Sequence, residues 1–387
     1  MTGLHPVMLI NEANFYMTGL HPVIAGIMIK LLKGLDWYVI ISILVLAGFS
    51  LAIINSVFQQ YFLPQLVFYI IGLGFYFLFA NIDHQIFRPF WLPIYFVSCF
   101  LLLVTFVIGI ESRGAVRWIE IVGFRLQLSE ILKPFILLSF ASYLADHPPR
   151  KLKDALFAGL FCLLPFLLVL KQPDLGSAII YALAFFGMIF IAGVPLRYFF
   201  LSTFSFLLSV PAVWHFLKDY QKDRILSFLN PSADPMGTSY NAIQAIIAVG
   251  SGQIFGKGLG HGTQSQLLFL PERHTDFIFS SFVEELGLVG GVLLLGAFAV
   301  ICHRIIKLIG QSDDSFGNYY LIGALFLLIG QIFINVGMNL GIVPVTGITL
   351  PLVSYGGSSI LSTMILLGII ANIAKDRGNK VQWGQSL

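Results

Sequence analysis

Ten apolar runs, most of them close to 20 residues long, constrain the fold of this chain more than any other feature. About 20 apolar residues form a helix long enough to cross the hydrocarbon core of a bilayer. Hydrophobic residues make up 57% of the 387 residues and charged residues only 11%, and a soluble core could not bury that much apolar surface. The sequence therefore predicts an all-α polytopic membrane protein with about ten transmembrane helices. They are expected near residues 37–57, 64–82, 91–110, 129–145, 155–170, 174–193, 199–216, 277–302, 318–340 and 356–374.

A long polar segment before the eighth helix divides the chain. Residues 1–30 contain MTGLHPV twice and are expected to lie outside the fold. Residues 31–216 would hold the first seven helices, 217–276 a large extracytoplasmic loop, and 277–387 the last three helices and a cytoplasmic tail. Within the loop, 240–249 is predicted to form a short amphipathic helix. So long a connection in a membrane protein is typical of a functional element.

The distribution of lysine and arginine predicts that both termini are cytoplasmic. With that orientation, the short outer connections at 58–63 and 341–355 contain no Lys or Arg, as expected if basic residues stay inside. The formal net charge of +3 is too small to indicate a nucleic-acid partner. Cys99, Cys162 and Cys302 lie in or beside apolar runs without metal-ligand spacing, so they indicate buried thiols and no metal site.

Several charges occur where a membrane protein rarely tolerates them. Glu130 and Lys133 are three residues apart and share a helix face. They could neutralise each other near the interface, or they could line a polar cavity in which Lys133 meets an anion. Arg117 beside Trp118 could be an interfacial anchor, or it could bind phosphate through its guanidinium group. Lys171 and Asp174 are expected to form a local ion pair in a short loop.

The segment PERHTD, residues 271–276, concentrates acids, a base and an imidazole at the start of the eighth helix. Thr275 or Asp276 could simply cap that helix. Capping leaves the crowding of Glu272, Arg273 and His274 unexplained, which favours a functional site. By helical geometry Glu284 and Glu285 cannot both face one pocket with Asp276, so at least one of them needs another partner. Downstream, residues 335–359 contain two prolines and several glycines and predict broken helix lining a cavity.

Five motifs, in order, resemble the SEDS family (RodA/FtsW/SpoVE). They are GAVRWIEIVGFRLQLSEILK, QPDLGSAII, DYQKDRILSFLNPSADPMGTSYNAIQA, GKGLGHGTQSQLLFLPERHTDFIFSSFVEELGLVG and NVGMNLGIVPVTGITLPLVSYGGSS. The words HGTQSQLLFLPERHTDF favour the RodA branch. Two positions depart from the family pattern: Leu128 stands where proline is common, and Gln253 where a second glycine is usual.

The resemblance implies a peptidoglycan glycosyltransferase that polymerises lipid II into β-1,4 glycan strands and releases undecaprenyl diphosphate by inversion. The essential acid of the family matches Asp276, which would be the base. Candidates for binding the diphosphate would be Arg117 and Lys133, with Arg224 or Lys257 as a further one, and Glu130 would position Lys133. Arg273 and His274, beside Asp276, complete the substrate-binding candidates. A divalent cation (Mg or Mn) is compatible with this chemistry, although no ligand cluster demonstrates one.

The resemblance also implies a bacterial cytoplasmic (inner) membrane location and partners. These would be a class B penicillin-binding protein and an elongation complex of the MreB/MreC/MreD type, with no nucleic acid. Two other functions remain open from the residues alone. A transporter of a polyprenyl-linked precursor would also have broken helices and intramembrane charges, and a scaffold would dock a partner enzyme without catalysis.

Overall fold

A computed structural model describes residues 34–384, apart from 113, 114, 122, 238, 312, 313 and several positions between 196 and 218. The duplicated N-terminal segment and most of the helix expected at 199–216 lie outside the described residues.

Long apolar helices dominate the described chain, which confirms the all-α membrane class. Seven are long and apolar enough to span a bilayer: α2 (Trp37–Val57), α3 (Phe62–Asn81, preceded by the 3-10 turn Gln59–Tyr61), α4 (Trp91–Ile108, preceded by the 3-10 turn His84–Phe90), α7 (Leu152–Lys171), α13 (Ile278–Leu308), α14 (Ser315–Asn339) and α15 (Gly357–Gly384). An eighth apolar helix, α8 (Leu175–Ile191), has 17 residues. The helix expected at 129–145 is two helices, α5 (Leu128–Ile131) and α6 (Lys133–Asp146), because the chain breaks at Leu132 ahead of Pro134.

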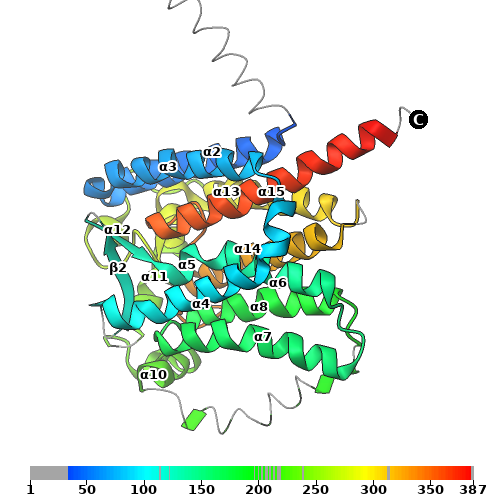
Figure 1. Cartoon of the computed structure of the whole chain (residues 1–387). Coiled ribbons are helices and arrows are strands. Elements are labelled where there is room, and N and C mark those ends of the chain that lie inside the picture. Colours follow the sequence, from blue (N-terminus) through cyan, green and yellow to red (C-terminus); the bar gives the residue numbers. More distant parts are fainter. Residues whose placement is uncertain are drawn as a thin grey trace, which may run out of the picture.

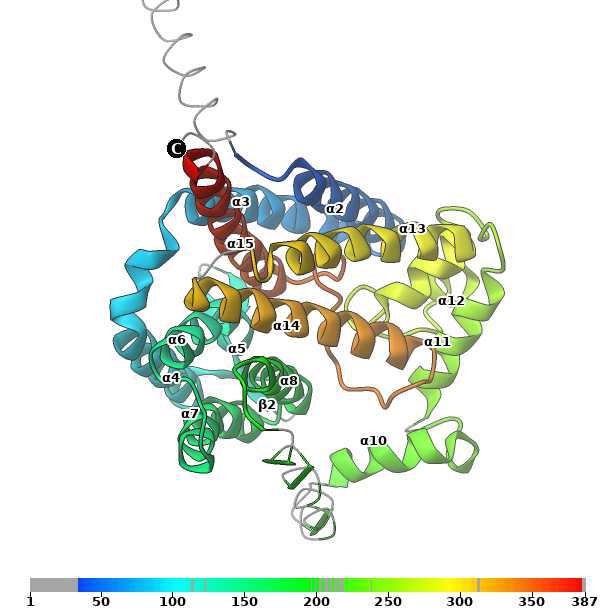
Figure 2. The same cartoon turned by 90° about the vertical axis from the view of Figure 1, so that its right-hand side faces the viewer.

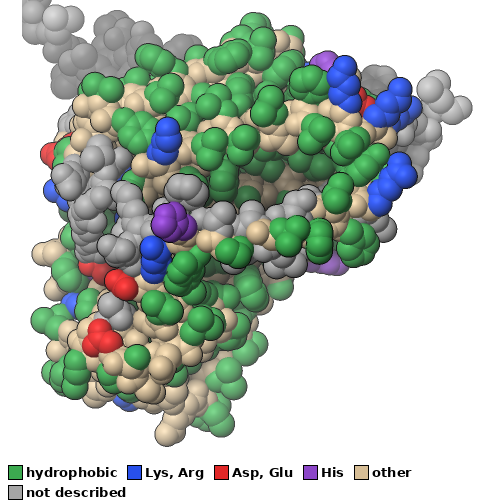
Figure 3. Space-filling view, turned by 90° about the horizontal axis from the view of Figure 1, so that it is seen from below, with side chains coloured by type: hydrophobic (Ala, Val, Ile, Leu, Met, Phe, Trp, Pro, Cys, Tyr) green, Lys and Arg blue, Asp and Glu red, His purple; other side chains and the backbone are tan. Residues whose placement is uncertain are grey.

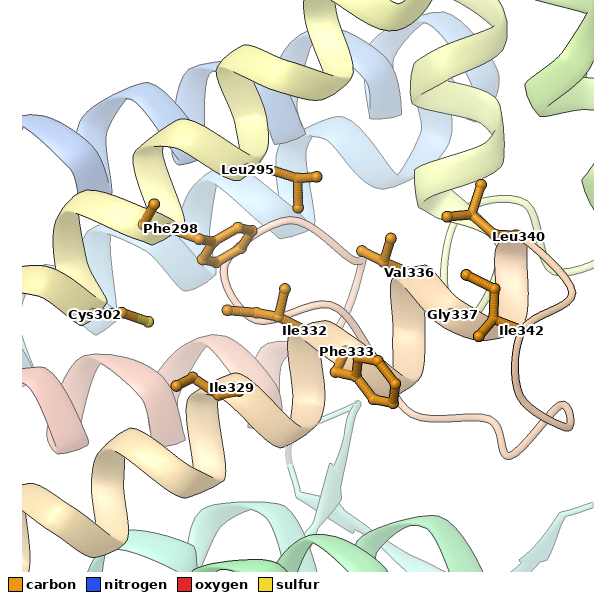
Figure 4. A pocket seen from close by; sticks show the side chains of 11 residues that line it. Leu295, Phe298, Cys302, Ile329, Ile332, Phe333, Val336, Gly337, Leu340 and Ile342 are labelled. Atoms are coloured by element: carbon orange, nitrogen blue, oxygen red, sulfur yellow. The ribbon is translucent and has the colours of Figure 1, made fainter.

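Helices α14 and α15 form the centre of the bundle. In their apolar spans 72% and 89% of the residues are buried, against 28% in α4 and in α7, so α4 and α7 present most of their surface to lipid. Helix α15 packs on α3, and α13 on α2, while α14 contacts α6 and α8 (Figures 1 and 2). A groove of about 330 Å³ between α13 and α14 is lined by apolar side chains, among them Phe298 and Phe333 (Figure 4).

Two irregular regions gather at one end of the bundle (Figure 1). The connection from α4 to α5 forms a three-stranded antiparallel sheet of β1 (Ile110–Ser112), β2 (Ala115–Ile121) and β3 (Phe124–Gln127), with Trp118 opposite Gln127. The long loop contains α10 (Asp219–Leu229), the 3-10 turn Pro231–Ala233, α11 (Tyr240–Ser251) and α12 (Thr263–Gln266). Helix α11 confirms the amphipathic helix predicted at 240–249, and it packs on α13 and α14.

At the other end of the bundle, the buried side chain of His84 ties α15 to the start of α14. Its Nδ1 lies 2.9 Å from Asn372 Oδ1, and its Nε2 lies 3.1 Å from Asp314 Oδ2. Burial alone would raise the pKa of Asp314, but hydrogen bonds from His84, Gln85 and the Gly317 N–H outweigh it and hold that pKa at about 2. This cluster keeps the ends of α14 and α15 in register.

The long loop is hydrogen-bonded into a break in α13. Gly287 has φ 69° and ψ −171°, so the α-helical bonds are interrupted there. The Lys257 N–H donates to Glu284 O at 3.0 Å, and the Leu288 N–H donates to Gln253 O at 2.8 Å. Gln253 also has a positive φ of 49°, a conformation that glycine adopts more readily. The loop therefore satisfies backbone groups that the break leaves open.

Gly287→Ala should destabilise the protein strongly. A Cβ at this position would lie 2.3 Å from Gly256 N, and the alanine would have to adopt a positive φ. We therefore expect the free energy of unfolding to fall by at least about 2 kcal/mol. The matched control is Gly296→Ala in the same helix, where a Cβ meets nothing within 4 Å. The control should be neutral or slightly stabilising, by up to about 1 kcal/mol. Thermal unfolding in detergent compares them, and equal midpoints would contradict this account of the break.

Candidate active site

Asp276 lies in an irregular turn between α12 and α13 and is half-buried. The N-cap position of α13 is Phe277, and no side chain caps the helix there. The Thr275 hydroxyl donates to Glu272 instead. The Thr275 hydroxyl therefore binds within the turn and does not cap α13.

The Asp276 carboxylate lies against the broken segment between α14 and α15. A methyl group added at Gly347 would be 3.4 Å from Asp276 Oδ2. Residues 341–356 are irregular, as their prolines and glycines predicted. This segment also contacts the start of α8, where a Cβ at Gly176 would lie 2.7 Å from Ile348 Cγ1 and 3.1 Å from Thr346 O. Residues 346–348 thus contact both the Asp276 carboxylate and the start of α8, and they form one wall of the candidate site.

A buried charged cluster lies at the start of α8. Lys133 is 1% exposed, and its Nζ donates to Glu130 Oε1 at 2.5 Å. The Ser177 hydroxyl donates to the same carboxylate at 3.3 Å. The two side chains therefore neutralise each other in the protein interior.

Asp174 joins this cluster, and its expected local ion pair with Lys171 is wrong. Its Oδ2 accepts from Gln127 Nε2 at 2.5 Å, its Oδ1 accepts from the Ser177 N–H, and Arg117 Nη1 lies 3.9 Å from it. Arg117 Nε is buried without a hydrogen-bond partner among the described residues. The sequence did not reveal that Asp174 belongs to this cluster, because its partners Gln127 and Arg117 are remote in sequence. The available signal was an Asp that follows a proline and directly precedes a helix.

The two neighbours of Asp276 in the PERHTD turn make structural contacts. Arg273 donates to the Val57 carbonyl and lies over the Phe58 ring. The His274 ring packs against Phe58 and Tyr61, at centroid distances of 4.9 and 5.0 Å. Both residues therefore attach the turn to the end of α2 and the start of α3.

Lys257 and Arg224 lie against other parts of the chain. Lys257 Nζ pairs with Glu284 Oε1 at 3.3 Å and bonds Thr263 Oγ1 at 2.7 Å. Arg224 lies on α10 at a cavity of about 160 Å³, whose lining also includes Asn241 and Val345.

The prediction that Glu284 or Glu285 needs another partner is confirmed for both acids, which are fully buried. Glu284 accepts from the Gln264 and Ser265 N–H groups, and Glu285 from the Ser56 hydroxyl and Gln266 Nε2. They hold the long loop in place.

The profile of the FtsW/RodA/SpoVE family, described as cell cycle proteins, matches residues 27–379. The chain belongs to this family. It is 41% identical over 290 residues to the peptidoglycan glycosyltransferase MrdB of Escherichia coli, covering 74% of this chain and 78% of the relative. It is 38% identical over 323 residues to a probable peptidoglycan glycosyltransferase FtsW of Geobacter metallireducens, covering 81% and 85%.

Solved structures of the same family have the same fold. A chain from a peptidoglycan synthase complex that coordinates polymerization and crosslinking superimposes with a TM-score of 0.78 at 32% identity. RodA of Thermus thermophilus superimposes with a TM-score of 0.68 at 27% identity. Each comparison covers 89% of this chain and 98% of the other.

The two departures from the family pattern fall at loop and helix junctions. Leu128 begins α5, and Gln253 lies in the loop that is hydrogen-bonded to the break in α13.

Among the described residues, no group of three or more His, Cys, Asp or Glu side chains could hold a metal ion.

Lys133→Met should destabilise the protein by about 3–5 kcal/mol, because it leaves Glu130 charged and buried. The double variant Glu130→Gln, Lys133→Met removes both charges, and we expect it to recover most of the stability. If the pair serves the reaction, this folded double variant loses activity. Thermal unfolding and product formation on the same preparations provide the two measurements. A stable, fully active double variant would reduce the pair to a structural contact.

Proposed function

We propose that this protein is a peptidoglycan glycosyltransferase that polymerises lipid II into β-1,4 glycan strands during cell elongation. The support is its family, its similarity to MrdB, and one observation that carries the mechanism. A half-buried carboxylate, Asp276, lies beside Gly347, and Thr346 and Ile348 of the same segment contact the start of α8, where Ser177 binds the buried Glu130–Lys133 pair.

In the proposed reaction Asp276 accepts the proton of the sugar 4-hydroxyl as its oxygen attacks the anomeric carbon of the other substrate. The bond from that carbon to the diphosphate breaks, and undecaprenyl diphosphate leaves with the electron pair. A single inverting displacement converts the α-linked lipid substrate into the β-linked product. The leaving group needs no proton because it departs as an anion, so cations suffice on that side.

Arg117 is the better candidate for first contact with the diphosphate. Its side chain is 26% exposed, whereas Lys133 is 1% exposed and bound to Glu130. Lys133 would then stabilise the diphosphate charge without touching it. Asp174 would hold Arg117 in place, and Glu130 would hold Lys133. Arg224, at the far side of residues 343–345, would meet a more distant part of the substrate. The contacts of Lys257 support a structural role for it.

The proposal includes membrane location and partners. With both termini in the cytoplasm of a bacterial inner membrane, the end of the bundle that carries Asp276 and residues 217–276 faces outward. The solved neighbour comes from a complex that coordinates polymerization with crosslinking. A class B penicillin-binding protein is therefore the expected partner, within an elongation complex of the MreB/MreC/MreD type.

Asp276→Asn should abolish polymerisation in proteoliposomes supplied with lipid II, with a fall of at least about 100-fold, because the amide cannot accept the proton. The measurement is glycan product resolved on a gel, after thermal unfolding shows that the variant is folded. Glu272→Gln is the matched control, an acid in the same turn, and it should retain activity. Normal product from Asp276→Asn would overturn the assignment. Lipid II crossing the bilayer without product in the wild type would favour a transporter.

A further inference from the structure

Three consecutive backbone carbonyls in the turn that carries Asp276 accept hydrogen bonds from the last quarter of the chain. The Tyr355 N–H donates to His274 O at 2.8 Å, and the Ser354 hydroxyl donates to Thr275 O at 2.7 Å. Two side-chain amides, Asn335 Nδ2 and Asn339 Nδ2, donate to Asp276 O at 3.0 and 3.1 Å. The main chain of the turn is therefore held at each of these residues.

The two asparagines are four residues apart on α14, so they lie on the same face of that helix. Both are fully buried. Asn339 Oδ1 accepts from the Ser280 N–H at 3.0 Å and from the Ser280 hydroxyl at 2.6 Å. These two bonds to Oδ1 orient the Asn339 amide so that its NH₂ group faces the Asp276 carbonyl.

Asn335 connects the two sides of the site. Its Nδ2 also donates to Ile348 O at 2.7 Å, so one amide group bridges the Asp276 turn and the wall at residues 346–348. Two carbonyl acceptors fix the orientation of this amide, because the flipped form would place oxygen against oxygen. The gap between the Asp276 carboxylate and Gly347 is therefore set by Asn335.

We propose that Asn335 and Asn339 are positioning residues that hold the Asp276 carboxylate at the distance and angle needed to take a proton from the acceptor sugar. This inference rests on the proposed function of Asp276. In a helix the backbone bonds would fix a carboxylate, but Asp276 precedes the first residue of α13. The asparagine amides take the place of those bonds by donating to the main-chain carbonyl of Asp276.

The experiment compares Asn335→Ala and Asn339→Ala with wild type in the lipid II assay. Each should lower kcat about 10- to 100-fold, because a displacement near 1 Å costs about that much, while KM for lipid II stays within about 3-fold. The matched control is Asn372→Ala, another buried asparagine, which binds His84 at the opposite end of the bundle. It should lower the midpoint of thermal unfolding and leave kcat unchanged. Unchanged kcat in both α14 variants would overturn the proposal.

Asn335→Asp separates positioning from packing, because its side chain has the same shape but donates a hydrogen bond only when protonated. Its kcat relative to wild type should rise as the pH falls from about 8 to 6, since burial favours the protonated carboxyl group. A ratio that stays constant with pH would contradict the inference. Ser280→Ala tests the positioning role of Asn339 if the other variants do not fold. It keeps the bond from the residue 280 N–H to Asn339 Oδ1 but removes the bond from the hydroxyl. It should lower kcat several-fold, and an unchanged kcat would count against the positioning role.

Asp276→Asn in the same assay distinguishes the two possible failures. If it is inactive while both asparagine variants are fully active, the positioning role of Asn335 and Asn339 is wrong, and Asp276 remains the proposed base. If it is active, the proposed function of Asp276 fails first.

Discussion

Backbone that leaves helical geometry inside a membrane protein must find its hydrogen-bond partners within the protein, because hydrocarbon offers none. Three such stretches meet at one end of this bundle: the turn before α13, the break at Gly287 and residues 341–356. Loop residues 253–258 satisfy the break, and side chains of α14 and the α14–α15 connection satisfy the turn. The buried polar residues near this end of α13 and α14 follow from that requirement. The same irregular backbone brings Asp276 beside Gly347.

The acids near this end differ in burial. Glu284 and Glu285 are fully buried; Glu284 accepts bonds from the Gln264 and Ser265 N–H groups, and Glu285 accepts them from Gln266 of the loop and Ser56 of α2. These donors offset the cost of burying the two carboxylates and attach the loop to the bundle. Asp276 is half-buried, so a substrate can approach it more readily than it can approach the two glutamates.

The sequence alone predicted the helices, which are determined by local apolar runs, and did not predict contacts between residues that are far apart in the chain. The apolar runs located α2, α3, α4, α7, α8, α13, α14 and α15 to within a few residues at most boundaries, because helix length follows bilayer thickness. The small sheet at 110–127 was not predicted, since its alternating residues are few and lie beside charges. The sequence suggested an ion pair of Asp174 with Lys171, but Asp174 binds Gln127, 47 residues away. Lys257 binds Glu284, 27 residues away. No local pattern encodes contacts over such distances.

An inverting displacement puts the attacking oxygen and the leaving group on opposite sides of the anomeric carbon, so the base and the cations must be held at a fixed separation. Residues 346–348 contact both regions of the site. Gly347 lies beside the Asp276 carboxylate, and Thr346 and Ile348 lie beside Gly176, next to the Ser177 that binds Glu130. The base and the cations come from segments more than 90 residues apart, so their separation depends on that wall staying fixed. Asn335, bound to both the wall and the Asp276 turn, supplies that constraint.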